Sequence, residues 1–178
     1  MIDYEKEYEL TKPSLDKEIS SDRFVFANSM IKKGDSVLEV GCNAGYLMKH
    51  IDKKIIYFGI DISKSAIKDN PYPCKVGNAE NFRVGKKFDK IVCLETIEHL
   101  ENPDKAIKNM FNHLKKGGLL IITTPRNNWI PDPSHLHIFT YKRWKDICET
   151  YTSNYSIKPI KKHKENTEKI LFSVTMEK

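Results

Sequence analysis

The sequence predicts an α/β fold, in which a doubly wound, mostly parallel sheet ends in an antiparallel hairpin. Short apolar runs alternate with amphipathic stretches along most of the 178 residues, and this pattern is typical of a parallel sheet with helices on both faces. The last two apolar runs have no helix between them, which predicts an antiparallel pair. A chain of this length is expected to form a single domain.

The N-terminal part is expected to be helical. Pro13 and Ser14 open a helical pattern that Gly34 closes, and four apolar residues fall near one face of it: Leu15, Ile19, Phe26 and Met30. We therefore expect residues 1–34 to form a helical segment that packs on a core domain over residues 35–178.

The core domain begins with three short strands separated by helices. Strands are expected at "SVLEV" (36–40), "KIIYFGID" (54–61) and, more weakly, "PCKVGNA" (73–79). A helix is expected over "AGYLMKHI" (44–51), and another should begin at Ser63 and stop before Asn70 and Pro71, because the residue before a proline disfavours the helical conformation.

The second half continues the alternation and then breaks it. "FDKIVCLE" (88–95) and "LLIITTP" (119–125) are expected to be buried strands. Between them, "NPDKAIKNMFNHLKKGG" (102–118) has a capping asparagine, a proline at the first helical position and two terminating glycines. A further helix should start at Thr140, and "NYSIKPIKK" and "ILFSVTM" form the closing hairpin.

Composition narrows the class of protein. The formal charge is 30 − 24 = +6 and the pI is near 9.0, which would suit an anionic partner such as RNA. The lysines, however, come in dispersed pairs, so a nucleic-acid surface is not the favoured interpretation. No run of about 18 apolar residues indicates a transmembrane helix, and the polar N-terminus is unlike a secretory signal, so we expect a cytoplasmic protein.

The four cysteines are expected to be reduced thiols. Cys42, Cys74, Cys93 and Cys148 have no CxxC spacing, and three of them fall inside expected strands or helices. Neither a zinc site nor a disulfide framework is predicted.

A glycine loop follows the first strand, at the edge of the sheet where α/β folds bind ligands. Gly41 and Gly45 allow close approach and positive φ, and Asn43 between them is the next most tolerant residue type. Asp61 ends the second strand, where a carboxylate can accept hydrogen bonds from both hydroxyls of a ribose. Glu39 stands two residues before the first glycine and suits an amino group.

A nicotinamide dinucleotide would also fit a loop that is followed, at the end of the next strand, by an acid such as Asp61. Its fingerprint, however, is G-x-G-x-x-G, whereas this loop is Gly-x-x-x-Gly. A ligand with a ribose, a positive amino group and no phosphate fits the loop and its two acids better.

A second group of polar residues follows the fourth and fifth strands. "LETIEHLENP" supplies Glu95, Glu98 and His99, and "PDPSHLHIF" brings His135 and His137 to the same edge. One interpretation is a site for Mg²⁺ or Mn²⁺; another is a metal-free general base drawn from these histidines; a third is that Glu98 and His99 only brace the loop. The residue pattern leaves all three open.

Taken in order, the motifs resemble those of class I S-adenosylmethionine (SAM)-dependent methyltransferases. "VLEVGCNAGYL" is similar to their first motif and "YFGIDIS" to their second, and the likeness continues through "VGNAENF", "FDKIVCLETIEHLENP", "LKKGGLLIITTP" and "HLHIFTYKRW". Within that family the chain looks like the methyltransferase type 11 and ubiquinone-pathway O-methyltransferase group. The resemblance implies a Rossmann-like, seven-stranded sheet and SAM as the methyl donor.

The resemblance also implies roles for individual residues. Gly41, Cys42, Asn43 and Gly45 would wrap the methionine portion, with Glu39 at its amino group. Asp61 would bind the ribose and Ile62 the adenine. Five further residues would complete the cofactor site: Asn78, Ala79, Glu80, Leu94 and Glu95. Asn43 and Asn78 depart from the commoner glycine and aspartate of the family.

The same resemblance bears on the acceptor. "ETIEHL" is similar to the Glu-x-x-Glu-His segment of ubiquinone-pathway O-methyltransferases and to that of small-RNA 3′-end 2′-O-methyltransferases, where it binds a metal. The expected function is therefore methylation of an oxygen on a small molecule, with His99, His135 and His137 as candidate catalytic residues. Glu95, Glu98, His99 and His137 are the candidate metal ligands. The alternatives are a metal-dependent RNA 2′-O-methyltransferase and a non-catalytic nucleoside-binding module.

Overall fold

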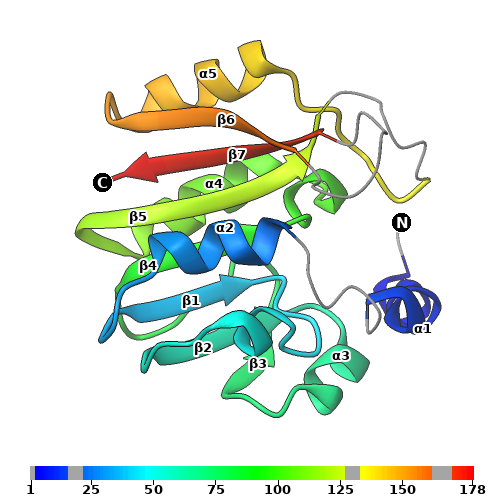
Figure 1. Cartoon of the computed structure of the whole chain (residues 1–178). Coiled ribbons are helices and arrows are strands. Elements are labelled where there is room, and N and C mark those ends of the chain that lie inside the picture. Colours follow the sequence, from blue (N-terminus) through cyan, green and yellow to red (C-terminus); the bar gives the residue numbers. More distant parts are fainter. Residues whose placement is uncertain (1–2, 16–21, 127–132, 162–169) are drawn as a thin grey trace.

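The chain forms one seven-stranded sheet with helices on both faces. The computed structural model describes residues 3–15, 22–126, 133–161 and 170–178. The strands lie in the order β3-β2-β1-β4-β5-β7-β6 (Figure 1). Their bounds are Ser36–Val40 (β1), Ile56–Asp61 (β2), Cys74–Val76 (β3), Phe88–Leu94 (β4), Leu114–Pro125 (β5), Tyr155–Lys161 (β6) and Ile170–Glu177 (β7).

The pairing of the strands confirms the predicted fold class. Strands β1 to β5 pair in parallel, whereas β7 lies antiparallel between β5 and β6. The chain order reverses next to β1, and the carboxyl ends of β1, β2 and β4 therefore meet at one edge. In α/β sheets this is the edge where ligands bind.

Two apolar layers hold the helices to the sheet. On one face, α4 (Pro103–Asn112) and α5 (Tyr141–Tyr151) pack on side chains such as Leu38, Ile91 and Ile122. On the other face, α2 (Asp22–Met30) and the 3₁₀ helix Leu47–His50 pack on Val37, Val92 and Ile121. Because side chains alternate along a strand, the faces of β1 are fixed: Val37 and Glu39 point to the α2 side.

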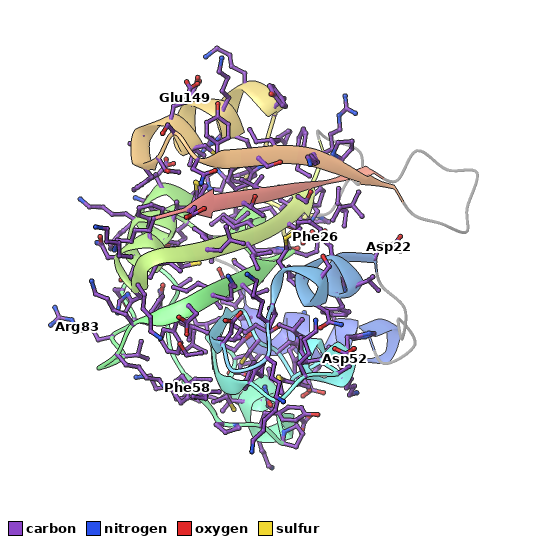
Figure 2. The ribbon with its side chains drawn as sticks, turned by 60° about the vertical axis from the view of Figure 1, so that its left-hand side comes forward. Asp22, Phe26, Asp52, Phe58, Arg83 and Glu149 are labelled. Atoms are coloured by element: carbon purple, nitrogen blue, oxygen red, sulfur yellow. The ribbon has the colours of Figure 1, made fainter. Side chains whose placement is uncertain are left out.

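Figure 2 shows how these layers fill the space between helices and sheet. Phe26 lies at the α2 side, while Glu149 on α5 and Phe58 on β2 mark opposite sides of the molecule along the strand order. All four cysteines are free thiols, as predicted. No helix in the described ranges is long and apolar enough to cross a bilayer.

Local capping signals predict three helix starts correctly. The side-chain oxygens of Ser63, Asn102 and Thr140 each accept a hydrogen bond from a backbone N–H in the first turn of α3 (Lys64–Asp69), α4 and α5. Helix α3 also ends at Asp69, before Asn70 and Pro71, as the proline rule requires.

Three predicted elements are wrong in part. The N-terminal helix does not begin at Pro13: α1 covers Tyr4–Leu15, so the proline lies in its last turn, and residues 16–21 lie outside the described part. The stretch 44–51 forms only a 3₁₀ helix at Leu47–His50. Helix α4 ends at Asn112, and β5 already begins at Leu114, because the main chain of Phe88 bonds to His113 and draws the following residues into the sheet.

Helix α1 is anchored at the carboxyl edge of the sheet, beside α3. The Glu5 carboxylate accepts hydrogen bonds from the Ser63 hydroxyl and from the backbone N–H groups of Lys64 and Ser65. The Tyr8 hydroxyl donates to Asp69 at 2.7 Å. In Figure 1, α1 lies at the end toward which the β1 arrow points.

Candidate functional site

The loop after β1 has the backbone conformation that its residue types predict. Gly41, Asn43 and Gly45 all have positive φ, at 77°, 46° and 79°. A Cβ at Gly41 would overlap the Thr96 side chain, and one at Gly45 would come within 2.7 Å of Asn70 Oδ1. Glycine is therefore required at both positions for steric reasons as well as for its φ.

Asp61 ties this loop to the end of β2. One carboxylate oxygen accepts the Asn43 N–H at 2.8 Å and the other accepts the Ser63 N–H at 2.9 Å. Burial raises the pKa of Asp61, although these backbone bonds oppose the shift. Each oxygen keeps further acceptor capacity, so the carboxylate is able to bind hydroxyl donors as well. Ile62, the next residue, is 39% exposed, an apolar surface next to the acid.

Glu39 lies in the middle of the sheet and is only 3% exposed. The Tyr57 hydroxyl donates a hydrogen bond to its Oε2 at 2.6 Å. Burial raises the pKa of Glu39 to about 8, and the nearby charge of Asp61 adds to the shift. A buried acid that is largely neutral at pH 7 gains its charge readily when a cation approaches it.

The predicted adenine-edge segment follows β3, where the Gly77 N–H donates to the Asp61 carbonyl, and two of its side chains make structural contacts. The Asn78 side chain accepts the Glu80 N–H at 2.8 Å, and the Ala79 carbonyl accepts from Asn109. The Glu80 carboxylate accepts the Asn102 N–H at 2.8 Å, at the start of α4. Glu80 is thus turned toward α4, which sequence pattern alone does not reveal.

A second cluster forms where β4 ends. Leu94 is buried, and Glu95 has a φ of 47°; within the described ranges, Glu95 and Asn43 are the non-glycine residues with positive φ. Strained backbone of this kind persists where the surroundings require it, often at functional sites. The following turn, a 3₁₀ helix over Ile97–His99, carries Glu98 and His99.

The histidine segment after β5 is held against this turn by main-chain bonds. The Glu98 carbonyl accepts the N–H groups of Leu136 and His137, at 2.9 and 3.1 Å. His99 Nδ1 lies 3.1 Å from the Ser134 carbonyl oxygen, and the His99 and His135 rings are 4.9 Å apart in an edge-on arrangement. Metal-ligand atoms of Glu98, His99 and His135 come within 4.8 Å of one another.

The structure brings part of the predicted metal set together. In the part of the chain that the structure describes, His135 joins Glu98 and His99, whereas His137 and Glu95 fall outside the group. His137 instead contacts this turn through its main chain, whose N–H donates to the Glu98 carbonyl.

The Glu98 side chain is the most deeply buried acid of the cluster, at 1% exposure. Its Oε2 accepts from the Thr124 hydroxyl at 3.2 Å, but Oε1 has no hydrogen-bond partner among the described residues. Burial and the charge of Glu95 raise the pKa of Glu98 well above its usual range. His137 Nε2 is likewise buried without a partner in the described ranges.

Comparison with known proteins decides the family. A family model described as a methyltransferase domain matches residues 15–163, most of the chain. The chain belongs to the class I SAM-dependent methyltransferases. It is 32% identical over 108 residues to a ubiquinone biosynthesis O-methyltransferase from Coxiella burnetii, an alignment that covers 54% of this chain and 46% of that protein. The chain thus spans about half the length of the curated relatives that it matches.

Solved structures agree on the fold. A SAM-dependent methyltransferase from Thermotoga maritima superposes with a TM-score of 0.74 at 17% identity, over 97% of this chain and 95% of that chain. The plantazolicin methyltransferase BpumL in complex with SAH gives 0.67 at 14% identity, over 97% and 88%.

The groups at this edge of the methyltransferase fit SAM. Glu39 is a buried acid for an ammonium, the loop from Gly41 to Gly45 allows close backbone approach, and Asp61 has acceptors for ribose hydroxyls. Sequence reasoning missed Tyr57 and Asn70: the Asn70 side chain donates to the Asn43 carbonyl at 2.9 Å and so braces the loop. The signal for Tyr57 was its alternation with Gly59 and Asp61 along β2.

Proposed function

We propose that this methyltransferase domain transfers the methyl group of SAM to a hydroxyl oxygen of a small-molecule acceptor, as an in-line displacement. The observation that carries the proposal is the cluster of Glu98, His99 and His135 beyond β4. Strand β4 is the direct neighbour of β1, which supplies Glu39 and the glycine loop. Proton-accepting groups thus lie one strand away from the donor site. The O-methyltransferase relatives from Coxiella burnetii support oxygen as the acceptor atom.

Residues of the cluster are suited to removing the proton of the acceptor hydroxyl. Because a carbonyl oxygen only accepts, its contact with His99 Nδ1 places the ring proton on Nδ1 and the lone pair on Nε2. A histidine held in this tautomer is a general base for a hydroxyl. SAM is already an activated donor, so positioning of the two reactants supplies most of the remaining catalysis.

A divalent cation, Mg²⁺ or Mn²⁺, also fits these residues. Glu98, His99 and His135 would hold it, since carboxylate and imidazole suit a hard or borderline cation, and a carbonyl-bound Nδ1–H is the usual outer partner of a ligating histidine. The buried Oε1 of Glu98 would gain a partner in this way, and the charge of the cation would stabilise the ionised acid. Such a cation would lower the pKa of an acceptor hydroxyl.

The test measures donor binding and methyl transfer separately. Calorimetric titration with S-adenosylhomocysteine establishes the donor site. Transfer from SAM to a catechol probe is then assayed in EDTA and with added Mg²⁺ or Mn²⁺, for wild type and for His99→Gln and His135→Gln. We expect both variants to bind S-adenosylhomocysteine normally and to lose about a hundredfold or more in turnover. His50→Gln is the control, because His50 stacks on Phe24 at the α2 face and is not a member of the cluster.

Each outcome is informative. Activity that needs added cation supports the metal-bound form, and activity retained in EDTA supports His99 or His135 as a base without metal. Transfer to the 2′-hydroxyl of an RNA 3′ end, with none to the catechol, would replace the small-molecule acceptor by RNA. Absence of S-adenosylhomocysteine binding would refute the proposal as a whole.

A further inference from the structure

Glu39 depends on one neighbour for its position. We assign this acid to the amino group of the donor, and its carboxylate is buried in the sheet. The hydrogen bond described to that carboxylate comes from Tyr57, across the gap between β1 and β2. Burial raises the pKa of Tyr57, so the phenol keeps its proton and acts as a donor.

The register of the two strands explains how the bond is made. Glu39 pairs with Gly59, and Tyr57 pairs with Val37, two residues earlier on the same face. The phenol must therefore lie across Gly59 to reach the acid. A Cβ at Gly59 would come within 2.9 Å of the Tyr57 hydroxyl and 2.7 Å of Cys42 Sγ, so the missing side chain makes room for the ring.

Other contacts hold the phenol in place. Tyr72 packs its ring edge-on against Tyr57, with the centroids 6.0 Å apart, and Tyr57 is buried. Cys42, which belongs to the glycine loop, fills the other side of the space above Gly59. The Tyr57 ring thus joins the loop, the acid and β2 in a single packed unit.

We propose that Tyr57 is a positioning residue that, through Glu39, sets the affinity of this methyltransferase for the amino-acid end of its donor. The inference rests on the proposed function, because it takes SAM as the ligand. The hydroxyl occupies Oε2 and fixes the orientation of the carboxylate, which leaves Oε1 to accept from the ammonium. A hydrogen bond to the charged form also favours ionisation.

The electrostatic surroundings of Glu39 disfavour its charged form, which the hydrogen bond from Tyr57 favours. Burial opposes the charge on Glu39, and Asp61 at the end of β2 opposes it too, whereas the Tyr57 bond favours it. Two buried thiols lie in electrostatic range of the acid, Cys42 from the loop and Cys93 from β4, and burial raises the pKa of both, so they remain neutral. Tyr57 is therefore the group that offsets the cost of a charged Glu39 before the ammonium arrives.

The experiment compares two ligands that differ only at the relevant end. S-adenosylhomocysteine carries the amino acid, whereas 5′-methylthioadenosine has the same nucleoside and thioether without it. In Tyr57→Phe, we expect affinity for S-adenosylhomocysteine to fall on the order of tenfold at pH 7 and affinity for 5′-methylthioadenosine to stay unchanged. The loss should be smaller at pH 8.5, where Glu39 ionises more easily without help.

Controls separate this role from simple packing. Tyr72→Phe removes a hydroxyl from the neighbouring ring and should leave both affinities unchanged. Gly59→Ala crowds the phenol from below and should reproduce the selective loss of S-adenosylhomocysteine affinity. Thermal unfolding and binding of 5′-methylthioadenosine report whether each variant is folded.

Equal weakening of both ligands in Tyr57→Phe, or no weakening of either, would overturn the positioning role. So would a loss that is the same at pH 7 and pH 8.5. These results differ from failure of the proposed function, in which the wild-type protein binds neither ligand.

Discussion

The substitution Glu39→Gln is expected to stabilise the ligand-free protein at pH 8 and to abolish tight donor binding. Burial raises the pKa of Glu39 from 4.5 to about 8. An acid whose pKa is higher in the folded state favours folding while it is protonated, and the protein loses stability as pH rises from about 4.5 to about 8. A neutral amide of the same shape avoids that loss.

The magnitude follows from the size of the shift. From pKa values of 4.5 unfolded and about 8 folded, ionisation of Glu39 costs about 4 kcal/mol at pH 8 and about 1 kcal/mol at pH 5. The buried amide N–H₂ of glutamine lacks the carboxyl's partners and costs about 1–3 kcal/mol at either pH. We therefore expect a net gain of about 1–3 kcal/mol at pH 8, and anything from no change to a loss of about 2 kcal/mol at pH 5.

Urea unfolding of the ligand-free protein at pH 5 and pH 8 measures both values. Glu101→Gln, at an exposed position, is the matched control and should change little at either pH. The informative quantity is the difference between the two pH values, in which the general cost of the amide cancels. If Glu39→Gln lowered the free energy of unfolding equally at both, Glu39 would already be ionised in the folded protein and the reasoning from its burial would fail.

Two further substitutions test the loop and the N-terminal helix. Gly41→Ala should cost at least about 1 kcal/mol of stability and remove S-adenosylhomocysteine binding, because a Cβ at this position overlaps the Thr96 side chain. Gly117→Ala is the control, since Gly117 has a similar φ of 72° but open space around it. This control measures the backbone strain alone and should leave binding intact. Glu5→Gln should speed hydrogen exchange in α1 relative to the control Glu9→Gln, because the Glu5 carboxylate holds α1 to backbone N–H groups of α3. These N–H groups lower the pKa of Glu5 to about 2. In the wild type, the contact should therefore weaken as pH falls from about 4.5 toward 2. Unchanged α1 exchange in Glu5→Gln, or intact donor binding in Gly41→Ala, would contradict these assignments.

The helix starts and the end of α4 show which element boundaries the sequence predicts and which it does not. The capping residues Ser63, Asn102 and Thr140 act within their own turn, and the three helix starts predicted from them were correct. The end of α4 was wrong because Gly117 looked like a helix terminator, whereas pairing with β4 draws the preceding residues into β5. A glycine has the same local preference for positive φ in either setting, and only the neighbouring strand distinguishes them.

The chain alone determined the edge of the sheet at which we place the donor site of this methyltransferase. Parallel strands end on one side, and backbone tolerance at Gly41, Asn43 and Gly45 is a local property, so the loop and its flanking acids Glu39 and Asp61 could be placed from residue order. Local rules of φ, ψ and alternation suffice for such features.

Tertiary structure alone decided which distant residues meet. It placed the His135 ring beside His99 and close to Glu98, and it brought Tyr57 across Gly59 to Glu39. It also docked α1, with Glu5, onto α3. These contacts join residues that lie far apart in the chain, so they depend on the path of loops and the register of strands, and neither is encoded in a local pattern.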